Sequence, residues 1–330
     1  MEGPKRATEL RPIVAVDLGG TWLRVALVDS RGKVLARIAE KARSQEGPER
    51  VVDRMAHAAK ALLTKNGFDA PLAVGAGVPG PIDSAGVIYE APHLLGWKDV
   101  PIKAMLAERF PVPVWVDNDA NVACLGEYTF GSGRGVKDLI YMTVSTGVGG
   151  GVISGGALVT GWRGLAGEVG HILIDPRGPR GKCGHVGCLE SLVSGTAIAQ
   201  LAVEALKGGH KSSLTGVVKR HLSRLKAEHV FQAAAQGDSL GRELVQQVAG
   251  DLARGIVSLV HIFNPRMFIL GGGVARNWHL LAPPVQEELR QHAMKGFLDG
   301  LVITPSQLGD DVGLVGAAAL AILEGDLKRG

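Results

Sequence analysis

At 330 residues, 46% apolar and 21% charged, the chain is long enough to bury two hydrophobic cores and has the composition of a globular protein. Its net charge of +4 comes from scattered basic residues without a run of five like charges, so we expect no nucleic-acid arm and no membrane patch. There is no apolar stretch of 18 residues and no apolar signal-peptide core, and three cysteines argue against a disulfide framework. We therefore predict a cytoplasmic protein.

The first motif joins two short strands, expected over residues 13–16 and 23–28, through Asp17-Leu-Gly-Gly-Thr21. A tight glycine turn exposes backbone N–H groups that can bind phosphate, and Asp17 beside them could hold Mg²⁺ directly or through water. Alternatively, the segment is an ordinary hairpin in which Asp17 only starts the turn. Because Gly-Gly turns are common, this motif alone does not decide between the two interpretations.

The next segments alternate between strand and helix patterns. Strands are expected at 34–38, 72–78 and 112–116, and helices at 48–65 and 101–109. The sequence Gly77-Val-Pro-Gly-Pro-Ile-Asp83 has two prolines and two glycines, which require a fixed loop. That loop either turns the chain or forms the wall of a pocket.

Four polar residues then occur in five, in Asp117-Asn-Asp-Ala-Asn121, where a strand leads into a helix expected over 120–128. Asn and Asp are preferred helix N-caps, and capping explains one of them. A further Asp at this junction could accept a proton from a substrate hydroxyl. Since one cap does not require four polar residues, the pattern favours a functional role.

A second strand, turn and strand follows, with strands at 139–144 and 152–153 around Ser145-Thr-Gly-Val-Gly-Gly-Gly151. It repeats the design of the first hairpin, and the repetition is more specific than either turn alone. We interpret the pair as duplicated halves that each bind phosphate, which favours a nucleotide-binding protein.

The most chemically dense segment runs from Ala166 to Glu190 and contains Glu168, His171, Cys183 and Cys188. Glycine-rich turns separate these side chains and allow the backbone to fold back on itself. Zinc prefers four nitrogen or sulfur ligands, and the sequence offers three in His171, Cys183 and Cys188. A core histidine beside two buried, reduced cysteines explains the same spacing equally well.

The remaining chain predicts helices at 189–206, 230–235, 240–263 and 313–323 and a strand at 302–304. An apolar strand before residue 271 leads through Gly271-Gly-Gly273 into a helix. A flat base can lie against such glycines because no side chain intervenes, although a plain strand-to-helix turn would have the same sequence.

Together these motifs resemble the ROK family of sugar kinases and sugar-responsive repressors, from Asp17 to Ala317. The most specific are Asn118-Asp-Ala-Asn121, residues 145–151, Gly167-Glu-Val-Gly-His171 and Cys183-Gly-His-Val-Gly-Cys188-Leu-Glu190. The resemblance implies an α/β fold of the actin-like ATPase (ribonuclease H-like) type, with two α/β domains around a cleft, often as a homodimer or homotetramer. We expect residues 1–117 and about 305–330 to form the smaller domain. Residues 118–304 should form the larger one, which contains the glycine-rich segment with His171, Cys183 and Cys188.

The resemblance also implies roles for individual residues. Asp119 corresponds to the general base for a sugar 6-hydroxyl, and its neighbours in the motifs correspond to substrate ligands: Gly80, Asn118, Glu168, His171 and Glu190. The phosphate and nucleotide turns correspond to Asp17, Gly19, Gly20, Thr21, Thr146, Gly147, Gly149, Gly150, Gly271, Gly272 and Gly273. His171, Cys183 and Cys188 correspond to zinc ligands.

Three positions depart from the family pattern. Gly181 stands where the family has a further zinc-ligating cysteine, and Cys124, one turn into the helix after Asp119, is a poor substitute. Zinc could bind through three protein ligands and water, or the site could be free of metal. Trp22 replaces a common Lys and His93 a common Asn, which could alter nucleotide or sugar preference.

We therefore expect a kinase that uses ATP and Mg²⁺ to phosphorylate a hexose at the 6-hydroxyl, with glucose first. N-acetylglucosamine, N-acetylmannosamine and fructose are alternative substrates, and polyphosphate or ADP alternative donors. Glu168 favours glucose-like substrates, because family members that phosphorylate N-acetylmannosamine can carry His there. A non-catalytic, sugar-sensing transcriptional regulator is the alternative of another class, but only about a dozen residues precede the first strand, too few for a helix-turn-helix.

Overall fold

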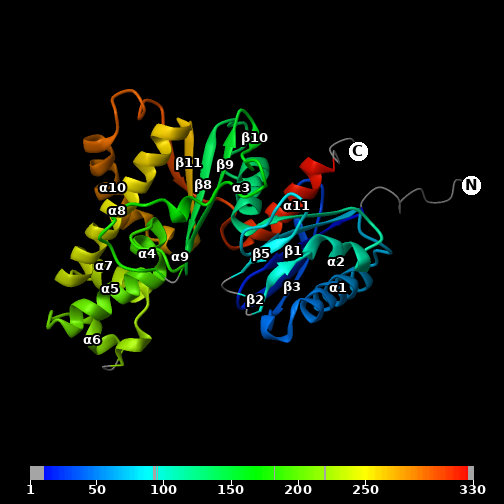
Figure 1. The fold of residues 1–330 in the computed structure, drawn as a ribbon, viewed down its shortest axis with the longest axis horizontal. Coiled ribbons are helices and arrows are strands. Elements are labelled where there is room, and N and C mark those ends of the chain that lie inside the picture. Colours follow the sequence, from blue (N-terminus) through cyan, green and yellow to red (C-terminus); the bar gives the residue numbers. More distant parts are fainter. Residues whose placement is uncertain (1–10, 92–93, 95, 182, 219–220, 326–330) are drawn as a thin grey trace, which may run out of the picture. The chain divides into compact units, whose positions relative to one another are not determined.

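The computed structural model describes residues 11–91, 94, 96–181, 183–218 and 221–325. The chain divides into two compact α/β units, coloured along the sequence in Figure 1. The first unit is formed by residues up to Gly135, by Leu158–Ala166 and by the residues from Gln307 onward. The second is formed by Val136–Ala157 and Gly167–Ser306.

The first unit ends at Gly135 rather than at the predicted residue 117, because helix α3 (Asp119–Phe130) packs closely against α11 (Val312–Glu324). Glycines allow this approach. A Cβ on Gly126 would lie 2.9 Å from the Cα of Gly316, closer than side-chain carbons approach a backbone. α3 therefore belongs to the core of the first unit.

The first sheet has the strand order β3-β2-β1-β4-β7. β1 runs antiparallel to β2 and parallel to β4, and β4 runs parallel to β7. A two-stranded antiparallel ribbon, β5 and β6, lies outside it. The strands are β1 (Ile13–Leu18), β2 (Trp22–Val28), β3 (Val34–Lys41), β4 (Ala73–Val78), β5 (Ile88–Glu90), β6 (Lys98–Val100) and β7 (Val114–Asn118).

Helices cover both faces of this sheet (Figure 1). Alternate residues of β1 and β4, such as Val14 and Val74, join one core with α1 (Pro48–Lys65) and α2 (Ile102–Arg109). The intervening residues face the other way, where α11 lies so close to β4 that a Cβ on Gly75 would overlap the Ala317 carbonyl. Burial on both faces explains why these strands are almost entirely apolar, with Asp17 near the end of β1 as the exception.

The second sheet repeats the order of the first, as β10-β9-β8-β11-β12. Its leading hairpin is antiparallel, and β11 is parallel to both β8 and β12. The two sheets therefore confirm the predicted duplication. Their strands are β8 (Leu139–Val144), β9 (Val148–Ser154), β10 (Ala157–Leu158), β11 (Met267–Gly271) and β12 (Val302–Pro305).

The helices of the second unit are α4 (Leu189–Val193), α5 (Gly195–Lys207), α6 (Leu214–Val217), α7 (Ala227–Ala235), α8 (Ser239–Phe263), α9 (Gly272–Ala275) and α10 (Trp278–His292). Four of them, α4, α5, α7 and α10, pack against the 25-residue α8. The single helix predicted over 189–206 is wrong, because Ser194 adopts an extended backbone and its side chain caps α5 at the Ala197 N–H. In the described part of the chain, no helix combines the length and apolar character needed to cross a bilayer.

The close packing of α11 on β4 predicts a strong effect of a single methyl group. Gly75→Ala should lower the free energy of unfolding by about 1–3 kcal/mol, because the new Cβ must displace the backbone of Ala317. Urea denaturation would measure this change. Gly250→Ala is the matched control: it lies within α8, its Cβ would meet no atom within 4 Å, and Ala should stabilise the helix by up to about 1 kcal/mol. Equal effects of the two substitutions would contradict the packing argument.

Candidate active site

The β1–β2 turn carries the first predicted phosphate motif. Asp17 is buried at the end of β1, where its Oδ2 accepts a hydrogen bond from Arg24 of β2. Burial raises the pKa of the Asp17 carboxyl, and the positive charge of Arg24 and its hydrogen bond oppose that shift. The Gly19 N–H donates to the Trp22 carbonyl at 2.8 Å, so this N–H closes the turn itself.

Trp22, at the position that departs from the family pattern, is half exposed beside this turn. The ammonium of Lys41 on β3 lies 3.9 Å from the centroid of the Trp22 ring, within the range of a cation–π contact. Lys41 thus places a positive charge beside the turn, although position 22 is Trp and not the Lys that is common in the family. His93, another position that departs from the family pattern, lies outside the described residues.

The polar cluster at the start of α3 separates into capping residues and one further carboxylate. Asn118 is the N-cap, since its Oδ1 accepts from the N–H groups of Ala120 and Asn121 at 2.9 and 3.4 Å. Its Nδ2 donates to the Gly80 carbonyl at 3.1 Å and ties the rigid loop to the helix. Asp117 accepts from the Asn118 N–H and from Asn121 Nδ2, and its burial raises its pKa. Asp119 is the first helical residue and is exposed.

The second predicted phosphate turn is shorter than expected. Only Ser145–Gly147 turn, whereas the glycines that follow pair within β9, Gly149 with Thr143 and Gly150 with Met142. A Cβ on Gly150 would lie 2.5 Å from a methyl group of Val169, so this glycine permits close packing. The prediction of a seven-residue turn is therefore wrong for its second half. Glycine, which has no side chain, can adopt the extended backbone of a strand as well as a turn.

The start of α5 holds the Ser145–Gly147 turn in place. The Gly195 N–H donates to the Ser145 carbonyl at 2.7 Å, and Thr196 Oγ1 donates to the Thr146 carbonyl at 2.9 Å. On the other side of the turn, Glu190 Oε2 accepts from the Val148 N–H at 3.0 Å. A Cβ on Gly147 would lie 2.5 Å from the same oxygen, so a side chain at this position would displace the Glu190 carboxylate.

Glu168 and His171 lie together at a short 3₁₀ turn, Val169–His171. His171 Nε2 and Glu168 Oε2 are 3.8 Å apart. Partial desolvation raises the pKa of Glu168, the nearby His171 opposes the shift, and Glu190 adds to it. The structure thus brings three of the predicted hydroxyl ligands into one electrostatic group.

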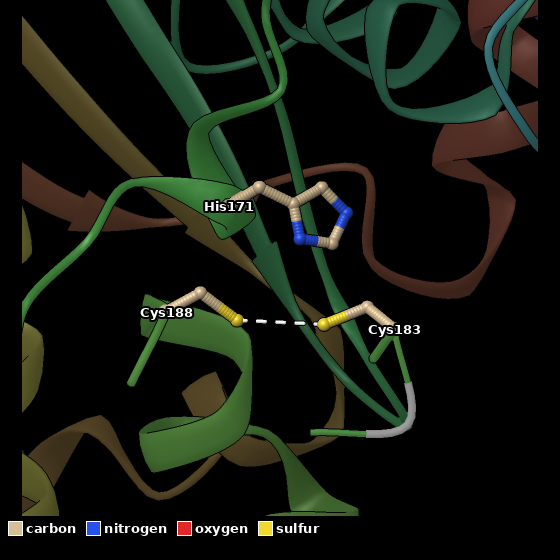
Figure 2. Close-up of side chains that lie close together, drawn as sticks. All are labelled: His171, Cys183 and Cys188. Atoms are coloured by element: carbon tan, nitrogen blue, oxygen red, sulfur yellow. Dashed lines mark hydrogen bonds between the residues drawn. The ribbon is translucent and has the colours of Figure 1, made fainter. Parts of the chain in front are cut away.

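The predicted metal ligands converge, as Figure 2 shows. Ligand atoms of His171, Cys183 and Cys188 all lie within 4.8 Å of one another, and the two sulfurs are 3.5 Å apart without a disulfide. A tetrahedral zinc with Zn–S bonds of about 2.3 Å would set two thiolates about 3.8 Å apart. Burial raises the pKa of the Cys183 thiol and the Cys188 thiol adds to this, whereas the His185 backbone N–H hydrogen-bonded to Cys183 acts in the opposite direction. The spacing and the donor set fit zinc.

A cavity of about 980 Å³ lies within the second unit and is lined by the predicted turns Ser145–Thr146 and Gly273. A Cβ on Gly271 would overlap the Tyr141 hydroxyl, and Gly272 has a positive φ of 85°. At Gly273, by contrast, an added Cβ would meet no atom within 4 Å, so this glycine borders open space. The cavity wall also includes side chains that sequence reasoning missed, namely Thr196, Lys226, Phe231 and Arg276. They come from separate helices and loops, and no motif spacing connects them.

Comparison with known proteins gives a consistent result. The model of the ROK family matches residues 13–324. A glucokinase from Thermotoga maritima is 38% identical over 309 residues, which cover 93% of this chain and 96% of the relative. A xylose repressor from Caldicellulosiruptor bescii is 31% identical over 94% of this chain and 78% of its own length.

The fold agrees with that of solved relatives. A ROK family glucokinase from Streptomyces griseus, solved in complex with glucose and AMPPNP, superposes with a TM-score of 0.81 at 33% identity. The match covers 94% of this chain and 99% of that one. Two mixed sheets in two α/β units confirm the predicted actin-like fold, and the match over residues 13–324 shows that this chain belongs to the ROK family.

Proposed function

We propose that this protein is an ATP-dependent hexose kinase that transfers a phosphoryl group to the 6-hydroxyl of the sugar, with glucose as the preferred substrate. The similarity to the Thermotoga maritima and Streptomyces griseus glucokinases supports this choice of reaction and sugar. The single observation that carries the proposal is found at the start of α3. Asn118 is the helix cap there, and the next residue, Asp119, provides a separate, exposed carboxylate.

Asp119 is the proposed general base. Asn118 caps α3, and Asp117 accepts hydrogen bonds from Asn118 and Asn121, so residues other than Asp119 supply the cap and these bonds at the helix start. Phosphoryl transfer depends mainly on positioning and charge neutralisation, and the hydroxyl loses its proton late. An exposed carboxylate positioned beside the hydroxyl suffices for that step.

The nucleotide would use the glycine turns and the cavity of the second unit. We assign the phosphates to the turns at Gly19–Thr21 and Thr146–Gly147, and the adenosine to the cavity beside Gly273. Such a cavity falls in the usual size range of small-molecule sites. Arg24 contacts Oδ2 of Asp17, so Oδ1 is the oxygen that would hold Mg²⁺ directly or through water. Mg²⁺ supplies neutralisation of the charge on the phosphate oxygens.

The sugar hydroxyls would be recognised by polar hydrogen-bonding groups. We assign this role to Asn118, Glu168, His171 and Glu190, with Gly80 as part of the loop that Asn118 holds. Carboxylates accept hydrogen bonds from hydroxyl groups, and the imidazole can donate or accept. A site built from such groups discriminates strongly against sugars that lack the matching hydroxyl.

A sugar-responsive regulator is the second candidate function, and the 31% identity to the xylose repressor supports keeping it. Such a protein would bind a sugar through the same polar groups but would not transfer phosphate. Turnover separates the two candidates directly, whereas sugar binding alone does not.

The base assignment predicts the outcome of one substitution. Asp119→Asn should lower kcat by about 10²- to 10⁴-fold, because a general base contributes that much to proton transfer. Binding of the sugar should survive, since the amide keeps the size and hydrogen-bonding capacity of the side chain. ADP release with glucose, N-acetylglucosamine, mannose, fructose and N-acetylmannosamine would measure turnover, and calorimetry would measure binding.

The control for this series is Asp69→Asn, which neutralises an exposed aspartate between α1 and β4 and should leave turnover unchanged. Substantial activity in Asp119→Asn would exclude Asp119 as the base. Sugar binding without turnover in the unmodified protein would favour the regulator.

We propose further that His171, Cys183 and Cys188 hold a zinc ion. When bound, zinc would convert both thiols to thiolates and fix the orientation of His171. Because Cys188 directly precedes α4, the ion would also fix the start of the helix that carries Glu190. The metal would thus have a structural role in placing two proposed sugar ligands.

This proposal predicts about one zinc ion per chain in the purified protein. Inductively coupled plasma mass spectrometry would measure this metal content. Cys183→Ala should remove the zinc and raise the KM for the sugar, because His171 and Glu190 lose their support. Cys124→Ala, which removes a buried cysteine from α3, should retain the metal. Zinc content that is unchanged in Cys183→Ala would contradict the assignment.

The environment of Glu168 predicts a pH dependence of sugar binding. A raised pKa means that Glu168 takes up its proton at a higher pH than an ordinary glutamate, and the neutral form is a weaker acceptor. The KM for the sugar should therefore rise as the pH falls through that raised pKa, and stay low above it. Steady-state kinetics across the pH range would measure this. In Glu168→Gln the effect should disappear, and an unchanged pH profile would assign it to another group.

A further inference from the structure

Three protein ligands leave a tetrahedral structural zinc site one ligand short. We propose that His185, in the turn between the two cysteines, is the fourth ligand, so that the site has two histidines and two cysteines. This inference rests on the zinc ion proposed above and adds a residue that lies outside the group of three whose ligand atoms are within 4.8 Å of one another.

The ring geometry supports His185. The centroids of the His171 and His185 rings are 5.8 Å apart, with the ring planes inclined at 59°. Two imidazoles on one tetrahedral zinc, with Zn–N bonds of about 2.0 Å, would have centroids about 5 Å apart. The two rings are therefore within about 1 Å of the separation that shared coordination requires. His185 is exposed, so a small rotation of its side chain meets no packed core.

The backbone of the turn directs His185 toward the cluster. The Gly181 N–H donates to the His185 carbonyl at 2.8 Å, and the Gly184 N–H donates to the Gly181 carbonyl at 3.0 Å. The His185 N–H itself hydrogen-bonds to Cys183 sulfur. This tight turn sets His185 opposite Gly181 and beside a proposed ligand. An N–H···S bond also stabilises a thiolate, so the same residue supports the site through its backbone.

Because position 181 is a glycine, a different residue must supply the fourth zinc ligand. A Cβ built on Gly181 would lie 3.1 Å from Cys183 sulfur, so a side chain at this position would reach the metal cluster. Glycine provides no ligand there. Of the nearby carboxylates, Glu190 is bound to the Val148 N–H and Glu168 lies against Nε2 of His171. His185 is thus the remaining nitrogen or sulfur donor that the described turn brings to the cluster.

The first test measures zinc binding directly. His185→Ala should weaken zinc affinity by at least about 100-fold, since even second-shell changes cost 10- to 100-fold. Competition with a chromophoric chelator would measure affinity, and X-ray absorption would count ligands. We expect two sulfurs and two imidazoles in the unmodified protein and one imidazole in the variant. The control is His279→Ala, which removes an exposed histidine of α10 and should change neither quantity.

The second test is a rescue that a merely structural role of His185 would not show. Gly181→Cys supplies a sulfur at the position beside Cys183, so the double variant with His185→Ala should regain tight zinc binding with three sulfurs and one imidazole. An unchanged affinity in His185→Ala, two sulfurs with only one imidazole in the unmodified protein, or no zinc at all would each overturn the inference. None of these outcomes bears on phosphoryl transfer, which the ADP assay judges separately.

Discussion

The hydrogen bond from the Val148 N–H to Glu190 connects the two parts of the second unit on which the proposed chemistry depends. Glu190 lies in the first turn of α4, directly after Cys188, and Val148 begins the strand after the phosphate turn. A side chain at position 147 would displace the Glu190 carboxylate, which lies beside it. The Leu189 N–H also donates to the Ile172 carbonyl at 3.0 Å, next to His171. The proposed metal ligands, the proposed sugar ligands of this unit and the proposed phosphate turn are therefore joined by one continuous set of contacts.

This connection gives the metal a physical role that does not involve the reacting atoms. Neither α4, with five residues, nor the 3₁₀ turn at Val169–His171 is long enough to be stable by its own hydrogen bonds. A zinc ion that joins His171, Cys183 and Cys188 would fix the ends of both. Glu168 lies directly before the 3₁₀ turn, and Glu190 is the second residue of α4. A zinc ion at the ends of both elements would therefore help to position these two proposed ligands, in addition to the packing of the buried Leu189 and Val193.

The sequence predicted most reliably those elements whose local signals agree with their packing. α1 matches its predicted range, residues 48–65, because Pro48 starts an apolar helical pattern and Gly67 follows it. α10 was missed because Pro283 and Pro284 lie inside it, where local propensity opposes helix and tertiary packing prevails. The glycines after Gly147 were expected to turn, yet they form β9 because their partners on β8 are already extended. Such choices depend on neighbours that are distant in sequence.

The residues of the candidate site can be divided in the same way, into those that local sequence predicts and those that only the fold brings together. The proposed base Asp119, the proposed phosphate turns and the proposed metal ligands occur in short motifs, because a strand end or a turn presents each of them. The cavity wall does not, since Thr196, Lys226 and Arg276 come from separate helices and loops and only the fold brings them together. His185 lies between these cases: it is inside a recognisable motif, but only the 5.8 Å separation of its ring from His171 distinguishes it from a surface histidine. A ligand supplied from a neighbouring position of the same turn would preserve the chemistry of a site while breaking its sequence pattern.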